Sequence, residues 1–346
     1  MFDIYSVVTC GVLFSLISLI IMRYYATSLG LVDIPCTRKK HVGDVPLVGG
    51  MSVYISICIS VSLSLDNTQE LNLFLIASSL MVFIGVLDDK YDLTVRSRLI
   101  GQFLISAILI FGVGKYIVSF GDILSIGNIE LGYLGIPITF LAVIAAINAF
   151  NMVDGIDGLL ASCAIVAFLG LAYFFYHNSD YSNFLVCITI ICSLIPFLLA
   201  NFAIFPFHGR KTFMGDAGSM LIGLAVVWFL VLGTQPSNSE KAAFSPVIAL
   251  YIISLPLMDM IAVIFRRIKA GKSPTQPGRD HAHHLLMEYG LSPKKTLCTM
   301  ILLYLFMVSA GLTLENVLSE SQLLITFLLL FFVYVVSMNL IGKKVK

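Results

Sequence analysis

The first group of residues that could perform chemistry consists of neighbouring aspartates at the end of an apolar segment. Asp88 and Asp89 are followed by Asp92, and a spacing of four residues places Asp88 and Asp92 on one face of a helix. Like charges this close repel each other unless a cation or a basic partner offsets them. The group therefore indicates either a solvated helix end or a magnesium site in which one carboxylate acts as a base or orients a nucleophile.

Amide and carboxylate groups recur three residues apart in a second group, formed by Asn148, Asn151, Asp154 and Asp157. Polar side chains with this period beside an apolar segment face the protein interior rather than lipid. Hydrogen bonding between membrane helices is one explanation, because asparagine supplies it. Two Asp-Gly pairs at the end of the stripe make packing alone a poor explanation, so we interpret the stripe as part of a functional site.

An aspartate between glycines forms the third group, where Gly215, Asp216 and Gly218 precede another apolar run. Glycine permits close approach to the backbone, and the start of a helix offers unpaired N–H groups to phosphate. Asp216 would repel phosphate unless a divalent cation lay between them, and magnesium is usually shared between a few protein oxygens and substrate phosphates. Asp216 is therefore the strongest candidate for a metal ligand, and Phe213 beside it could stack on a base.

Three histidines follow Arg279 in the fourth group: His281, His283 and His284. A zinc site would need three or four defined ligands, and no pattern of cysteines or acids completes such a set. Imidazoles among basic residues suit a pyrophosphate, because they donate hydrogen bonds and can carry charge for a leaving nucleotide. Asp259 stands apart inside an apolar segment, where it indicates either a functional group or an ion pair with a neighbouring arginine or lysine.

Membrane helices must position these groups. The chain has 346 residues, of which 58% are hydrophobic and 12% charged, and its mean hydropathy is +0.97, far outside the range of soluble domains. A span needs about 20 mostly apolar residues. About eleven such stretches begin near residues 4, 47, 71, 99, 136, 158, 184, 213, 244, 296 and 321. We therefore expect an all-α polytopic membrane protein with a single domain over residues 1–346.

Lysine and arginine alternate sharply between successive loops. All but two of the 21 basic residues belong to one set of loops, and only Lys115 and Lys241 belong to the other. Cytoplasmic loops carry the excess of basic residues, so the polar groups are expected in loops on the cytoplasmic face. The longest of these loops, 266–295, carries the histidines. A net charge of +1 gives no reason to expect nucleic acid as a partner.

Together the Asp-Asp-x-x-Asp, Asp-Gly-x-Asp-Gly, Phe-Met-Gly-Asp-x-Gly-Ser and histidine motifs resemble those of the polyprenyl-phosphate N-acetylhexosamine-1-phosphate transferases, in family order and over nearly the whole chain. The resemblance implies transfer of N-acetylglucosamine 1-phosphate from UDP-N-acetylglucosamine to undecaprenyl phosphate in a bacterial inner membrane. UMP would be released, and an O-antigen, common-antigen or related cell-envelope glycan would begin. The segment 280–285 is similar to the N-acetylglucosamine branch, whereas the alternative phospho-N-acetylmuramoyl-pentapeptide branch carries adjacent histidines followed by an acid.

The resemblance also implies roles for residues. Asp88 and Asp89 would be catalytic, and Asn151 and Asp216 would hold Mg²⁺, or Mn²⁺ in its place. The expected substrate-binding residues are Lys40, Asn148, Asp154, Asp157, Phe213, Gly215, Arg279, His281, His283 and His284. Direct displacement is favoured over a route through an aspartyl-linked sugar phosphate. Whether the protein forms a homodimer stays open.

From a different class, an ion-coupled secondary transporter would also carry acids within its spans. Transporter sites lie near the bilayer midplane on broken helices. Here the acids gather at the inner ends of spans, and the histidine loop lies outside the hydrocarbon. This distribution favours an enzyme.

Overall fold

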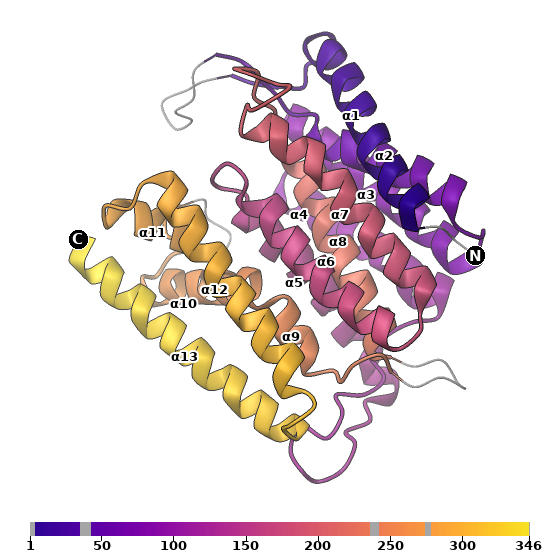
Figure 1. The fold of residues 1–346 in the computed structure, drawn as a ribbon. Helices are drawn as coiled ribbons and strands as arrows, with labels where there is room; N and C mark the ends of the chain where they lie inside the picture. Colours follow the sequence, from indigo (N-terminus) through magenta and orange to yellow (C-terminus); the bar gives the residue numbers. More distant parts are fainter. Residues whose placement is uncertain (1–3, 35–42, 236–241, 274–277, 346) are drawn as a thin grey trace.

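A computed structural model describes residues 4–34, 43–235, 242–273 and 278–345, and these form a bundle of helices with the two termini on opposite sides (Figure 1). Lys40, predicted to bind substrate, lies outside the described residues. The longer helices are α1 (Ile4–Leu29), α2 (Gly49–Ser64), α3 (Gln69–Tyr91), α4 (Val95–Ala107), α5 (Gly135–Val153), α6 (Leu159–His177), α7 (Tyr181–Asn201), α8 (Gly215–Thr234), α10 (Ser254–Lys269), α12 (Pro293–Leu314) and α13 (Glu320–Val345). The short elements are β1 (Val32–Asp33), β2 (Val45–Pro46), η1 (Ile108–Val113), η2 (Gly132–Leu134), α9 (Ile248–Ile252) and α11 (Ala282–Glu288).

Nine helical segments among the described residues are long and apolar enough to cross a membrane. They confirm the expected all-α polytopic membrane fold. The two other expected spans differ from simple crossings: α2 has only 16 residues, and the segment near residue 244 is divided into α9 and α10. Part of the 266–295 connection is also helical, because α10 continues to Lys269 and α11 follows.

A proline explains the break between α9 and α10. Pro256 has no N–H group, and in a continuous helix its ring would clash with the carbonyl of Ile252, four residues earlier. The break leaves that carbonyl without a helical partner. The hydroxyl group of Tyr304, a fully buried residue of α12, donates to it instead. This hydrogen bond offsets the free-energy cost of leaving a backbone carbonyl without a partner inside the bundle.

Helix α8 is the centre of the bundle, with 94% of its apolar window buried. It packs against α2, α3, α5 and α6. Glycines permit the closest approaches near its first turn: a Cβ atom on Gly50 would lie 2.2 Å from the backbone nitrogen of Gly218, and one on Gly85 would lie 2.2 Å from Cα of Ala217. Small residues at such crossings let helices in a membrane approach closely. The start of α8 is thus held between α2 and α3.

Backbone hydrogen bonds fix the two residues that precede α8. Strands β1 and β2 pair antiparallel. The N–H of Phe213 donates to the carbonyl of Pro46 at 2.9 Å, and the N–H groups of Gly49 and Gly50 donate to the carbonyls of Phe213 and Met214 at 3.0 and 2.9 Å. From α1, the guanidinium of Arg23 donates to the connection before them. The entry to α8 is therefore anchored by α1, β2 and α2.

Candidate functional site

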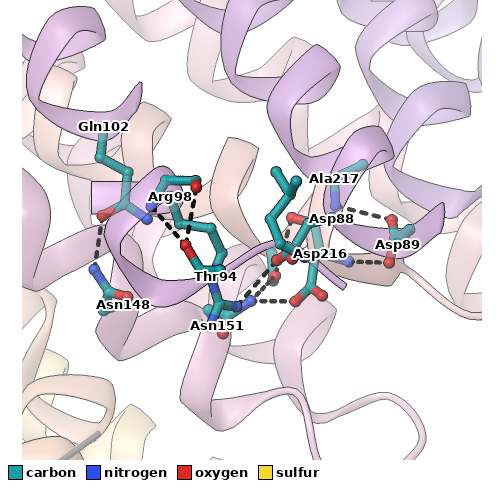
Figure 2. A network of polar contacts seen from close by, with 12 residues as sticks. Asp88, Asp89, Thr94, Arg98, Gln102, Asn148, Asn151, Asp216 and Ala217 are labelled. Carbon is teal, nitrogen blue, oxygen red and sulfur yellow. Dashed lines mark hydrogen bonds and ion pairs between the residues drawn. The ribbon is translucent and has the colours of Figure 1, made fainter. Parts of the chain in front are cut away.

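Asp89, at the end of α3, caps the first turn of α8. The backbone N–H groups of Asp216 and Ala217 donate to the two oxygens of its carboxylate at 2.8 and 3.2 Å (Figure 2). A carboxylate at this position satisfies donors that have no partner within the helix and also interacts favourably with the helix dipole. Both oxygens of Asp89 are thus occupied in holding the backbone of Asp216.

The neighbouring Asp88 is a buried, paired carboxylate. Its oxygens accept from the backbone N–H of Leu93 at 2.8 Å and from the guanidinium of Arg98 at 3.0 Å, and only 2% of its side chain is exposed (Figure 2). Asp92, by contrast, is exposed and ends α3 with a left-handed backbone. The acidic group therefore divides into one buried carboxylate, Asp88, one partly buried carboxylate, Asp89, and one solvated helix end, Asp92. The sequence indicated that these close carboxylates need a cation or a basic partner, and the structure identifies Arg98 as the basic partner of Asp88.

Asn151 and Asp216, the predicted metal ligands, lie side by side. Nδ2 of Asn151, near the end of α5, donates to Oδ1 of Asp216 at 2.5 Å and to the hydroxyl of Ser219 at 2.8 Å (Figure 2). Asn148, one turn earlier, donates instead to Oε1 of Gln102 at 2.8 Å and to the carbonyl of Ile144 at 2.7 Å. The two asparagines of the stripe therefore make different contacts: Asn151 lies at the acidic site, and Asn148 lies between α4 and α5.

The connection between α5 and α6 carries the other two acids of the stripe. The side chain of Asp154 is accessible to solvent, although many protein atoms surround its carboxyl group. This burial, together with the charges of Asp216 and Asp157, raises its pKa to about 7. Asp157 forms an ion pair with Lys211 at 2.5 Å, and both side chains are substantially exposed. Asp154 therefore faces the acidic site, whereas Asp157 is tied to the connection that precedes α8.

The histidine group lies against the same connection. A Cβ atom on Gly155 would lie 2.0 Å from Nε2 of His283, so the missing side chain makes room for the imidazole. Burial first, and then the charges of His284 and His281, lower the pKa of His283 to about 3. Burial also lowers the pKa of His284. His283 is therefore neutral near pH 7, so it can offer hydrogen bonds to a substrate but no positive charge.

The remaining predicted residues occupy the edges of this region. Phe213 is partly buried in its contact with the segment after β2, and Gly215 has a left-handed backbone with φ of 74°. Arg279 is exposed at the start of the histidine segment. The carboxylate of Asp280 receives two hydrogen bonds from Arg267, at 2.9 and 2.7 Å. Burial acts to raise the pKa of Asp280, but the hydrogen bonds and charge of Arg267 outweigh it and lower that pKa.

The oxygen groups of this site suit magnesium. Among the residues described, no three histidine, cysteine, aspartate or glutamate side chains are grouped so that they could hold a metal by themselves. Mg²⁺ is commonly bound by one or two carboxylates, with waters and substrate phosphates as the other ligands. Asp216 with the amide of Asn151, beside Asp154, is a donor set of this kind. The site therefore fits a cation that is shared with a phosphate-bearing substrate.

The amino-acid sequence is similar to those of known proteins. Residues 71–234, from α3 to α8, match the family described as Glycosyl transferase family 4. The undecaprenyl-phosphate alpha-N-acetylglucosaminyl 1-phosphate transferases of Yersinia pestis and Escherichia coli (strain K12) are each 39% identical over 326 residues, which cover 93% of this chain and 88% and 87% of those proteins. The protein of the same name from Haemophilus influenzae is 38% identical over 93% of this chain and 90% of its own length.

Proposed function

Because the chain belongs to glycosyl transferase family 4, we propose that it transfers N-acetylglucosamine 1-phosphate from UDP-N-acetylglucosamine to undecaprenyl phosphate and releases UMP. The observation that carries the proposal is the convergence of Asp88, Asp89 and Asp216 from α3 and α8 beside Asn151. The names of the relatives support both substrates. The excess of basic residues at the same end of the bundle supports a cytoplasmic site in a bacterial inner membrane.

The proposed reaction is a direct displacement. An oxygen of the lipid phosphate attacks the sugar-bearing phosphorus in line, and the bond from that phosphorus to the oxygen of UMP breaks. Phosphate monoesters have a second pKa near 6, so the acceptor is largely dianionic at neutral pH and needs no strong base. Magnesium bound at Asp216 and Asn151 would supply neutralising charge. Phosphoryl transfer depends mainly on such charge and on positioning.

The roles of the two acids of α3 follow from their contacts. Asp89 holds the first turn of α8, and with it the carboxylate of Asp216, in place. Asp88 orders the turn into α4 through Leu93 and Arg98. With their oxygens engaged in this way, both acids act in the proposed mechanism without forming a bond to phosphorus. Isolation of a phosphosugar on either acid, in a single turnover without lipid, would contradict direct displacement.

A donor comparison tests the proposed function. Membranes that contain the protein, supplied with undecaprenyl phosphate and Mg²⁺, are given UDP-N-acetylglucosamine, its N-acetylgalactosamine epimer or UDP-N-acetylmuramoyl-pentapeptide. We expect UMP and a lipid-linked product, with the highest kcat/KM for UDP-N-acetylglucosamine. A preference for the muramoyl nucleotide would place the protein in the peptidoglycan branch. Uptake of substrate into vesicles without any product would instead favour a transporter.

The requirement for Mg²⁺ should depend on pH through Asp154. A carboxyl with a pKa of about 7 is mostly ionised at pH 8 and mostly protonated at pH 6. A proton on Asp154 and a cation at the adjacent Asp216 compete with each other, because both are attracted by the negative charge of this acidic site. The Mg²⁺ concentration that gives half-maximal rate should therefore rise about tenfold from pH 8 to pH 6. In Asp154→Asn this rise should disappear; an unchanged rise would show that another group titrates.

An apolar cavity offers a place for the prenyl chain. It has a volume of about 350 Å³, lies between α5, α8, α9 and α10, and is lined mainly by apolar residues that include Ala145, Val227, Leu250 and Leu257. Two of these helices, α5 and α8, also carry Asn151 and Asp216, so a lipid whose phosphate reaches the site can lay its chain along them. The nearest lining residue of α8, Val227, is roughly 16 Å from Asp216 along the helix axis, so we propose that isoprene units beyond the first ones occupy this cavity.

Filling the cavity should weaken lipid binding selectively. In Ala145→Phe we expect the KM for undecaprenyl phosphate to rise about tenfold, because the added ring occupies space needed by the chain and about 1.4 kcal/mol of binding is lost. The KM for the nucleotide sugar should stay unchanged. Leu104→Phe, at a position of α4 that is 62% exposed, is the control and should leave both constants unchanged. Equal behaviour of the two variants would exclude the cavity.

A further inference from the structure

Asp259 is a buried carboxylate whose partner is a histidine rather than a neighbouring arginine. It lies in α10 with 1% exposure. Its oxygens accept from Nδ1 of His281 at 2.8 Å, from the N–H of Ala282 at 2.9 Å and from the hydroxyl of Tyr334 at 3.1 Å. These three donors, from His281 just before α11, from Ala282 at the start of α11 and from Tyr334 in α13, offset the cost of burying this charge.

The nearby arginines are directed elsewhere. Arg267 pairs with the carboxylate of Asp280, and Arg266 donates to the backbone carbonyl of Asp280 at 2.5 Å. Both arginines therefore stabilise the segment before the histidines. The ion-pair explanation of Asp259 is wrong in its choice of partner: the acid is linked to the histidine motif itself.

The contact with Asp259 fixes the protonation of one ring nitrogen. A carboxylate only accepts hydrogen bonds, so Nδ1 of His281 carries the hydrogen and Nε2 is left for another partner. Within the described residues no hydrogen bond to this Nε2 is present. The ring is parallel to that of His283, with centroids 5.7 Å apart and planes 10° apart, and His283 lies against Gly155. His281 is therefore held at the border of the acidic site with Nδ1–H directed at Asp259 and Nε2 turned to another partner.

From this arrangement we infer that Asp259 and Tyr334 are positioning residues: with Nδ1–H of His281 bound to Asp259, a second proton on the ring places an N–H group at Nε2, which donates to the phosphates of the nucleotide sugar. The inference rests on the proposed function and assigns a task to α13, which contributes no residue to the acidic site itself. His281 would support the charge that develops on the departing UMP, an interaction that is stronger in the transition state than in the ground state. Its loss should therefore lower kcat rather than raise KM.

Two substitutions separate positioning from mere folding. Asp259→Asn keeps the shape but removes the negative charge that favours a doubly protonated ring at His281. His281→Asn keeps a short donor toward Asp259 and removes Nε2. Each should lower kcat by about 30- to 100-fold, with the KM for UDP-N-acetylglucosamine within about twofold of wild type and little change in the thermal unfolding temperature in detergent.

The double variant decides the matter. If Asp259 acts through His281, Asp259→Asn combined with His281→Asn should be no slower than His281→Asn alone. Losses that multiply would show that Asp259 only supports the fold and would overturn the inference. A wild-type enzyme that releases no UMP from UDP-N-acetylglucosamine would instead overturn the proposed donor and the inference that rests on it.

Tyr334→Phe provides a milder test should Asp259→Asn fail to fold. It removes one hydrogen bond and should lower kcat about threefold to tenfold, with no effect when His281 is already asparagine. The control is Tyr289→Phe, since Tyr289 is 47% exposed and makes no hydrogen bond to Asp259 in the part of the chain that the structure describes. Equal losses in the two tyrosine variants, or a loss from Tyr334→Phe that persists beside His281→Asn, would contradict the positioning role.

Discussion

Asp216→Asn should reduce the rate of sugar-phosphate transfer by about a thousandfold. The carboxylate stands at the first turn of α8, next to the amide of Asn151, and its charge acts on Asp154. Asparagine has the same shape but no charge, so the variant should fold normally and lose the proposed main ligand for the cation. Its thermal unfolding temperature should match or exceed that of the wild type, because one of several mutually repelling carboxylates is removed. Initial rates over a range of Mg²⁺ concentrations measure the loss.

Asp157→Asn is the matched control for that experiment. Its carboxylate belongs to the neighbouring Asp-Gly-x-Asp-Gly motif but pairs with Lys211 at the surface, and exposed ion pairs contribute little. We expect its rate to stay within about threefold of the wild type. An Asp216→Asn enzyme with full activity would remove Asp216 from the cation site. Similar losses in both variants would show that general charge, and not one ligand, controls the rate.

Gly215→Ala should cost about a hundredfold in activity and lower the thermal unfolding temperature. The backbone of Gly215 is left-handed, and a Cβ atom there would lie 2.5 Å from Oδ2 of Asp89. The added methyl group would push away the carboxylate that caps α8, and Asp216 would move with the cap. A displacement of about 1 Å at a reacting centre can cost about a hundredfold in rate.

Gly209→Ala separates the clash from backbone strain. Gly209 lies in the same connection with φ of 70°, but a Cβ atom there would meet nothing within 4 Å. Both variants share the cost of a left-handed alanine, about 1 kcal/mol, whereas only Gly215→Ala disturbs Asp89. The difference in kcat between them measures the value of the cap. Equal rates for the two variants would show that Asp89 does not position α8 for catalysis.

The order of helices could be predicted from sequence because each span must satisfy a length and an apolarity set by the bilayer. The break between α9 and α10 also has a local cause that the sequence contains, Pro256, although we expected a single span there. The contacts of the site were not predictable in this way. Asp89 and the N–H of Asp216 are 127 positions apart, and no local pattern distinguishes a helix cap from a catalytic base.

Partners of single residues were the hardest to foresee. The two asparagines of the stripe have the same chemistry, yet Asn148 faces Gln102 of α4 and Asn151 faces Asp216 of α8. Helical spacing identifies a shared face but not the neighbour on that face. Asp259 had arginines within eight positions, and its actual partners come from α11 and α13. The experiments above test the roles of Asp154, Asp216 and His281, and the role of Lys40 stays a prediction.

The enclosure of α8 separates the chemistry from the thickness of the surrounding bilayer. Hydrophobic mismatch acts on helices that touch lipid, through tilting and local deformation of the bilayer. Only 17% of the apolar window of α13 and 28% of that of α1 are buried, against 94% for α8. The outer helices can therefore tilt to match a thicker or thinner membrane while α8 keeps its orientation. Asp216 would thus be shielded from changes in lipid composition during growth.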